Sequence, residues 1–338
     1  MSPRLGISPH TFELQVLPGE VIEQKIKIFN QSEVPIPMTT RVTDFTAEEE
    51  SGQMIFDEVS QDPSFASRFW FKIENPDFIL DPGEVEKVRF QIQVPDNAEP
   101  GGHYAVMIFE PKLPSFYFEE KAMVRNIPEI GVLFLFSVKK FTLEPEAEQK
   151  LEVVEFSVPK EKRLVRLENF ISGITASVAQ AASVSIVENP PSKFILRIKN
   201  NDIYHIKPFG KVLIYNISGK RVGESEVPQR TILPGKIRSF PVEFSPEIPK
   251  SLKWLPASVS NFLVQNLFVG KYQAKLELQA KSPVAAEVLQ PTIPIILTFF
   301  SLPWKFWLSV ILIFGTLMIF SFKYRERIKK AAKILISR

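Results

Sequence analysis

The sequence predicts an all-β protein: two β-sandwich domains in tandem, followed by a single transmembrane α-helix near the C-terminus. Three observations lead to this prediction. Short segments in which apolar and polar residues alternate recur ahead of the C-terminal region, which is the pattern of half-buried strands. Turns containing Pro-Gly separate several of these segments, and no long stretch there has helical periodicity. One uncharged apolar segment, residues 306–322, reaches the length needed to cross a hydrocarbon core.

The first sandwich is expected to cover residues 1–145. Ile22, Gln24, Ile26 and Ile28 alternate with Glu and Lys, which predicts a strand with one buried face. Residues 88–94 repeat this alternation. A Pro-Gly turn comes shortly before each of the two strands, at 17–20 and at 81–84, where Pro and Gly suit a tight turn. Regularly spaced short strands of this kind indicate a sandwich.

The second sandwich is expected over residues 191–300 and repeats the features of the first. A further Pro-Gly turn at 233–236 precedes an alternating strand, and Ser218-Gly219-Lys220 joins two strands as a hairpin. The stretch between the domains, residues 146–190, is charged, interrupted by proline and then apolar, so we predict a linker followed by an apolar insertion. The chain therefore contains a tandem repeat of two similar domains.

Two apolar insertions interrupt the second domain, at residues 170–187 and 251–269. Neighbouring strands of a sandwich alternate in direction and the last strand must end at the membrane, so both insertions are expected at the membrane-proximal end. One hypothesis is that they form short helices whose apolar side chains rest on the outer leaflet or on the transmembrane helix of a partner. The alternative is that they fold back over the sandwich as core. The side chains concerned are Trp254, Leu255, Phe262 and Phe268.

The predicted transmembrane helix covers residues 301–324. A soluble helix needs a polar face, and this segment offers only scattered Ser, Thr and Gly. Aromatic residues mark both ends, where amphipathic rings favour the headgroup region, and a lysine can extend its charge outward. The predicted membrane-interface residues are Trp304, Lys305, Trp307 and Tyr324.

The charges that flank the helix predict its orientation. Residues 323–338 carry seven Lys or Arg and one Glu, a net charge of +6, against +1 from Lys305 on the other side. Subtracting both from the +3 of the whole chain leaves −4 for residues 1–304. By the positive-inside rule, the C-terminus is cytoplasmic and the N-terminal part is an ectodomain. The basic tail, residues 325–338 with the preceding lysine, either lies on an anionic inner leaflet or is a solvated flank. The basic residues assigned to this tail are Lys323, Arg325, Arg327, Lys329, Lys330 and Lys333.

Cysteine is absent, which excludes a disulfide framework and thiolate metal sites. The first ten residues lack the apolar core of a signal peptide, so the sequence does not reveal an export route.

No arrangement of residues predicts catalysis. The three histidines, His10, His103 and His205, are scattered and none belongs to a zinc-binding pattern. Gly223-Glu224-Ser225-Glu226-Val227 lacks the second glycine of a nucleophile elbow, and the acidic residues 48–50 lack the spacing of a calcium loop and are expected to be a solvated turn. We therefore expect no enzyme activity, no catalytic residue, no metal and no cofactor.

A long connection near residues 110–130 contains adjacent aromatic residues. Phe116, Tyr117 and Phe118 precede two glutamates there. Long loops in compact domains are often functional and exposed aromatic side chains anchor interfaces, so these three are candidate partner contacts. Alternatively, they pack on their own sheet.

Several motifs together resemble those of the WxL-interacting cell-surface proteins. In the first domain they are FELQVLPGE, KIKIFNQS, SGQMIF and VPDNAEPGGHYAVMIF, and in the second IKNND, LIYNISGKRV, TILPGK and VGKYQAKLEL. The resemblance covers most of the chain. It implies immunoglobulin-like, PapD-like sandwiches on a membrane anchor, the first contacting a cell-wall polymer and the second an external protein.

The function expected is therefore that of a single-pass protein of the cell membrane. It would present two sandwiches for adhesion or scaffolding, binding the lipid bilayer and a cell-wall polymer or surface protein, but no nucleic acid. Because the net positive charge of the chain comes from the tail and residues 1–304 carry −4, the sequence pI of 8.8 does not indicate nucleic-acid binding. The insertions would allow assembly with another membrane protein. The alternative is a tail-anchored cytosolic adaptor with domains similar to major sperm protein, and the basic tail opposes it because that tail would have to cross the membrane.

Overall fold

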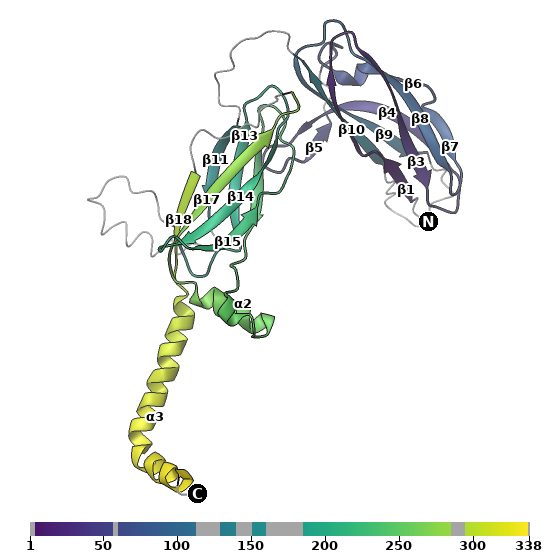
Figure 1. Ribbon diagram of the computed structural model, residues 1–338. Helices are drawn as coiled ribbons and strands as arrows, with labels where there is room; N and C mark the ends of the chain where they lie inside the picture. The colour runs from purple at the N-terminus through teal and green to yellow at the C-terminus, as the bar shows by residue number, and fades with distance from the viewer. Residues whose placement is uncertain are drawn as a thin grey trace, which may run out of the picture.

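A computed structural model describes residues 4–56, 60–112, 129–139, 151–159, 185–284 and 295–336. Figure 1 shows two β-sandwiches joined end to end and a long helix that leaves the far end of the second one. The fold class predicted from the sequence is confirmed: the chain is all-β apart from short helical segments and one long apolar helix at the C-terminus.

The first sandwich consists of two sheets around an aromatic core. One sheet has the order β1-β3-β8-β6, and the other has the order β2-β10-β9-β4-β5, with β7 also paired to β4. Phe12, Phe90 and Phe134 lie between the sheets, where the rings of Phe12 and Phe134 are stacked with centroids 4.9 Å apart. The strands are β1 (Leu5–Ser8), β2 (Thr11–Val16), β3 (Val21–Asn30), β4 (Ile36–Ala47), β5 (Met54–Phe56), β6 (Phe71–Ile73), β7 (Asp77–Leu80), β8 (Val85–Gln93), β9 (Gly101–Pro111) and β10 (Ile130–Val138), with the short 3-10 helix η1 (Ser67–Trp70) before β6.

The second sandwich has the same strand order. Its sheets are β11-β13-β16 and β12-β18-β17-β14-β15. In both domains the first strand is divided between the sheets, since β2 pairs in parallel with β10 and β12 pairs in parallel with β18. The predicted tandem repeat is thus present at the level of topology. The strands are β11 (Leu151–Ser157), β12 (Ser185–Val187), β13 (Lys193–Asn200), β14 (Lys207–Asn216), β15 (Arg221–Glu226), β16 (Ile237–Glu243), β17 (Gly270–Lys281) and β18 (Ile295–Ser301).

The prediction of a linker and insertion over residues 146–190 is wrong in part. This stretch contains β11, which pairs with β13, and β12, which pairs with β18. Glu152 and Glu155 of this stretch lie on β11, an edge strand with one face toward solvent, and residues 146–150 lie outside the described residues. Residues 160–184, which include most of the insertion predicted at 170–187, lie outside the described residues, so the insertion falls between the two halves of the divided first strand.

A buried asparagine ends the equivalent strand in each sandwich and joins two loops. In the first domain the Asn30 amide donates to the carbonyl oxygens of Val34 (2.7 Å) and Leu80 (2.9 Å). In the second, the Asn200 amide donates to Tyr204 (2.8 Å) and Ile232 (3.0 Å). Buried carbonyls need such donors because burial without a partner is costly.

The same asparagines also bind the Pro-Gly turns that the sequence repeats. The backbone carbonyl of Asn30 accepts from Gly83, and that of Asn200 accepts from Gly235, at 2.9 Å in each case. Each asparagine therefore fixes the turn that leads into the next strand of its sheet.

Three helical segments complete the described chain. The 3-10 helix η4 (Lys250–Leu252) and α2 (Ala257–Leu267) lie between β16 and β17, and α3 (Trp304–Ile336) follows β18. The sequence predicted a helical insertion at 251–269, and α2 lies within those bounds.

We predict that Asn200→Ala destabilises the second sandwich. The substitution removes the amide that donates to the carbonyls of Tyr204 and Ile232 in the interior, and the side-chain oxygen that accepts from the Asp202 N–H. We expect the free energy of unfolding to fall by about 2–4 kcal/mol, measured by urea denaturation of the full chain in detergent. The control is Asn201→Ala, which removes an exposed hydrogen bond to Glu152 and should cost less than about 1 kcal/mol. Equal losses in the two variants would contradict the assignment.

Candidate functional site

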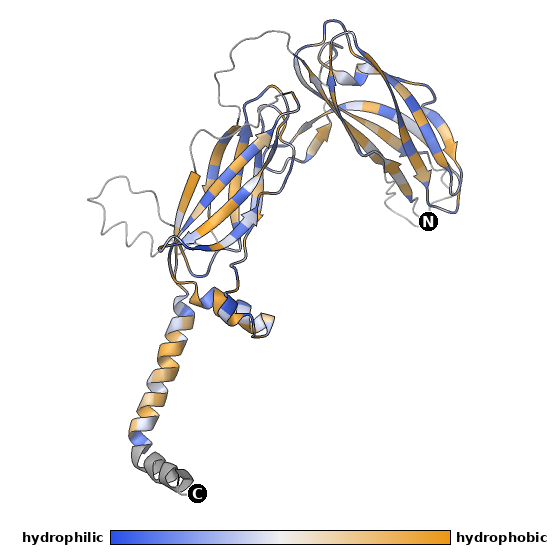
Figure 2. Ribbon diagram, viewed as in Figure 1, coloured by the Kyte–Doolittle hydropathy of each residue, from blue (hydrophilic) through white to orange (hydrophobic). Residues whose placement is uncertain are grey.

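The helix α3 contains a segment that is long and apolar enough to cross a membrane. This segment is Trp304–Tyr324, 21 residues with a mean hydropathy of 1.9, and none of it is buried against the protein. Figure 2 shows the run of hydrophobic residues along the helix. A helix that is apolar on all sides and buries none of them in its own fold needs another apolar environment.

The residues predicted at the membrane interface lie at the two ends of this segment. Trp304 and Trp307 belong to the first turn of α3, and Lys305 there forms an ion pair with Glu188 at 3.0 Å. Tyr324 lies 20 residues further on, or about 30 Å along the axis at 1.5 Å per residue, which matches a hydrocarbon core. Lys323 is exposed beside it. The helix continues to Ile336, and the side chains of Arg325, Arg327, Lys329, Lys330 and Lys333 lie outside the described part of the chain.

The insertion at residues 251–269 emerges at the end of the sandwich from which the helix leaves, as predicted, while residues 170–184 of the other insertion lie outside the described residues. Strand β16 ends and β13 begins at this end, because Glu243 pairs with Lys193. Strand β17 begins there, since Gly270 is opposite Ser301, the last residue before the connection to α3. Figure 1 shows α2 beside the start of α3. We call residues 250–269 together with 302–307 the base.

Contacts within the base join α2 to α3. The ring of Phe262 packs edge to face on that of Phe306, with centroids 5.8 Å apart. The hydroxyl of Ser260 donates to the carbonyl of Leu252 at 2.9 Å, which ties α2 to η4. The Leu302 N–H donates to the Val187 carbonyl at 2.8 Å, so β12 also holds the start of the span.

The four predicted contact residues of the base divide between surface and core. Trp254 is 79% exposed and Phe262 is 55% exposed, while Leu255 is half-buried. The prediction for Phe268 is wrong: it is only 6% exposed and stacks on Tyr272 with ring centroids 3.9 Å apart. Phe268 follows the end of α2, where the chain turns back into β17, and its side chain enters the sandwich core. The other predicted partner contacts, Phe116, Tyr117 and Phe118, lie outside the described residues.

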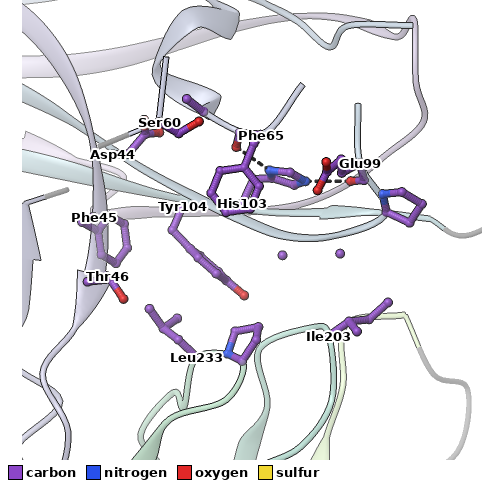
Figure 3. Close-up of a pocket in the computed structure, with 15 residues that line it drawn as sticks. Asp44, Phe45, Thr46, Ser60, Phe65, Glu99, His103, Tyr104, Ile203 and Leu233 are labelled. Atoms are coloured by element: carbon purple, nitrogen blue, oxygen red, sulfur yellow. Dashed lines mark hydrogen bonds between the residues drawn. The ribbon is translucent and has the colours of Figure 1, made fainter. Parts of the chain in front are cut away.

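A second candidate site is a cavity of about 540 Å³ between the two sandwiches. Figure 3 shows aromatic and apolar side chains of the first sandwich facing Ile203 and Leu233 of the second. A volume of this size is in the range of ligand sites. We call this cavity the cleft, and its lining residues are Asp44, Phe45, Thr46, Ser60, Phe65, Ala66, Glu99, Pro100, Gly101, Gly102, His103, Tyr104, Ile203, Leu233 and Pro234.

Two polar side chains of the cleft, His103 and Asp44, are engaged within the protein. Both ring nitrogens of His103 lie within hydrogen-bond distance of backbone carbonyls, Nδ1 at 2.8 Å from Phe65 and Nε2 at 2.7 Å from Glu99. The carboxylate of Asp44 forms an ion pair with Arg68 and accepts from the Ser67 hydroxyl at 3.1 Å. Burial raises the pKa of the Tyr104 hydroxyl, which keeps it protonated.

One acidic turn of the first sandwich docks on an edge strand of the second. Glu50 uses its backbone N–H to donate to the Ile237 carbonyl and its carbonyl to accept from Ser239, both at 2.9 Å, so it pairs with β16. The Glu50 carboxylate also receives two bonds from the Arg197 guanidinium, which raises the pKa of Arg197. Residues 48–50 are exposed, as expected of a solvated turn, but the sequence did not predict the pairing of Glu50 with β16, because pairing between domains is not visible in local sequence.

Further contacts close the other side of the cleft. The Gly102 N–H donates to the Ile203 carbonyl at 2.9 Å, and the Tyr204 hydroxyl donates to the Val138 carbonyl at 3.1 Å. An ion pair joins Lys207 to Glu13. His205 is buried edge to face against Tyr104, with ring centroids 5.8 Å apart.

The part of the chain that the structure describes contains no cluster of side chains that could bind a metal ion. No three His, Asp or Glu residues gather there in positions that would hold an ion. His10, His103 and His205 occupy separate places: an exposed position before β2, the cleft wall and the domain contact. The arrangement instead offers a largely apolar concave surface on which the side chains of His103 and Asp44 are already paired.

Comparisons with known proteins find similar solved structures at low sequence identity. No protein-family model matches the sequence, and no curated protein matches it. Solved structures that resemble the chain include the E. coli chaperone DraB (13% identity, 86% of this chain and 99% of that one, TM-score 0.34) and the class 5 fimbriae chaperone CfaA (13% identity, 88% and 100%, TM-score 0.36). Another is the complex of the Salmonella enterica SafA pilin with the SafB chaperone (11% identity, 87% and 95%, TM-score 0.36). These neighbours are PapD-like sandwiches, and none is identified as a WxL-interacting protein.

We predict that Gly52→Ala loosens the contact between the sandwiches. Gly52 has a φ of +64°, and a Cβ there would lie 2.5 Å from the Arg238 guanidinium, which is held by a bond to the Thr231 carbonyl. We expect a broader and longer distance distribution between nitroxides on Lys87→Cys and Lys220→Cys, measured by pulsed electron paramagnetic resonance. Gly83→Ala is the matched control, because Gly83 has a φ of +74° with no atom within 4 Å. The same distribution in both variants would refute the docking role.

We also predict a pH dependence of stability that originates at His205. Burial lowers the pKa of His205 to about 4. The charge of Glu13 raises this pKa by a smaller amount, and the charge of Lys207 lowers it slightly further. The unfolded chain then binds a proton that the folded chain does not, so stability falls as the pH drops below about 6.5 and the loss is complete near pH 4. Between pH 7 and pH 5 we expect His205 to account for a loss of up to about 2 kcal/mol.

The measurement is urea denaturation at both pH values, compared between the natural chain and His205→Phe, which keeps a ring against Tyr104 without a titrating nitrogen. Other groups titrate in both proteins, so the difference between the two losses isolates this residue. Equal losses would show that His205 is not responsible.

Proposed function

We propose that this chain is a single-pass membrane protein that holds two β-sandwiches outside the cell membrane to bind a cell-wall polymer or surface protein. The observation that carries the proposal is the exposure of the whole segment Trp304–Tyr324. Leu, Ile and Phe side chains lie on every side of it, and their transfer out of water is favourable in free energy. The aromatic residues at its ends and the net charge of +6 after it support insertion with the C-terminus in the cytoplasm.

The proposed partner binds to the sandwiches. The cleft supplies an apolar concave surface, and β5 next to it is an edge strand whose residues Met54, Ile55 and Phe56 are all exposed. Exposed apolar side chains beside a cavity are typical of interaction surfaces. The resemblance of the sequence motifs to WxL-interacting proteins points to a cell-wall polymer or a surface protein as the ligand.

The proposed function involves no catalysis. The ring nitrogens of His103 both face carbonyls, and the Asp44 carboxylate is paired with Arg68, so neither is placed to act as a base. We propose no cofactor and no metal. Adhesion or scaffolding requires only that the sandwiches be presented.

We predict that the two ends of the chain lie on opposite sides of the membrane. Because the chain has no cysteine, Ser51→Cys and, separately, Ser337→Cys each provide one labelling site. On intact cells an impermeant maleimide should label the Ser51→Cys chain and leave the Ser337→Cys chain unlabelled until the cells are lysed. Ser51 is exposed, which makes its reaction a fair reference.

Labelling of Ser337→Cys alone would overturn the proposed orientation. Labelling of neither site until lysis, with the chain in the membrane fraction, would favour the tail-anchored cytosolic adaptor. Recovery of the chain in the soluble fraction without detergent would overturn the membrane anchor itself.

A further inference from the structure

The helix α2 has three distinct faces, and only one is covered by the protein. Ser260 and Val264 are buried, and the Ser260 hydroxyl donates to the preceding segment at the Leu252 carbonyl. At 3.6 residues per turn, Ser258, Asn261 and Gln265 then share one flank and Val259, Phe262 and Leu263 share the other. We call these the polar flank and the apolar flank. A helix that only covered the sandwich would need a single apolar stripe.

The apolar flank is exposed and continuous with the membrane helix. Val259 is 41% exposed and Phe262 is 55% exposed. Phe262 contacts Phe306 in the first turn of α3. Asn266, on the same side, donates one amide N–H to the Phe262 carbonyl at 2.8 Å. Any bilayer that surrounds the apolar segment of α3 has its headgroup region beside this flank.

The charges around α2 fit an anionic surface. The sequence has no Asp or Glu between Glu247 and Glu277. In the same stretch Lys250, Lys253 and Lys271 are all exposed. Lysines near a leaflet are attracted to anionic headgroups, and an exposed indole such as that of Trp254 favours the headgroup level.

We propose that α2 lies in the interfacial layer of the bilayer that α3 crosses, with its apolar flank toward the acyl chains and the neighbouring Lys250, Lys253 and Lys271 on anionic phospholipid headgroups. The inference rests on the proposed membrane anchor. It identifies phospholipid as the molecule that covers the exposed face of α2. It makes the base a two-point attachment, with one helix through the membrane and one along its surface. The second sandwich would then be held at a fixed tilt, which a single helix does not impose.

Site-directed spin labelling of the full chain tests this arrangement. One nitroxide is attached at Val259→Cys, at Gln265→Cys on the polar flank as the matched control, or at Leu312→Cys in the middle of the apolar segment of α3. The protein is placed in nanodiscs of phosphatidylcholine and phosphatidylglycerol. Collisions with oxygen, which concentrates in lipid, are compared with collisions with a water-soluble nickel chelate.

The expected result is an oxygen-to-nickel collision ratio several-fold higher at position 259 than at 265, and highest at 312. In nanodiscs of phosphatidylcholine alone, the ratio at 259 should fall toward that at 265. A lipid-exposed label at 312 with an aqueous label at 259 would refute the inference about α2 and leave the anchor intact. A label at 259 that neither reagent reaches would mean that protein, such as a second copy, covers the flank, which also refutes it. An aqueous label at 312 would refute the anchor itself.

Discussion

The direct passage of β18 into α3 is the constraint on which the rest of the architecture depends. Only Leu302 and Pro303 separate the last strand residue, Ser301, from the first residue of the helix. Because β17 runs antiparallel to β18, its first residue lies at the same end, and the strand pairings then determine which loops meet there. The helical insertion before β17 is consequently placed against the start of the apolar segment. The strand pairings alone are therefore sufficient to place α2 at the base.

The same constraint sends the other loops of the second sandwich to the opposite end. Strand β13 runs away from the base and ends at Asn200, and the loops that hold Ile203 and Leu233 follow there and face the first sandwich. Strand β17 has 12 residues, so the two ends lie about 35 Å apart at 3.3 Å per residue. The cleft is thus separated from the base by the length of a domain.

Particular residues show how far the sequence predicts this arrangement. Alternation and Pro-Gly turns predicted the strands because each is a local signal. The asparagine that ends β3 or β13, Asn30 or Asn200, is a further repeated feature, and the structure explains it by hydrogen bonds. The halves of the divided first strand, β11 and β12, were missed because 27 residues, 158–184, separate them. Phe268 was misplaced because apolar spacing in an insertion does not tell core from surface. The docking of Glu50 depends on a strand almost 200 residues away, which no local pattern records.

The contacts between the sandwiches are weaker than those within them. Each sandwich has its own core of buried aromatic and aliphatic side chains, whereas the domains meet through scattered backbone bonds and ion pairs. The pair between Glu50 and Arg197 is partly exposed, so it contributes at most about 1 kcal/mol. The boundary that opens most readily in the chain is therefore the cleft, and not the base, where a strand continues into a helix. A ligand that enters the cleft needs only to exchange these polar contacts for its own, while the membrane-facing end keeps its geometry.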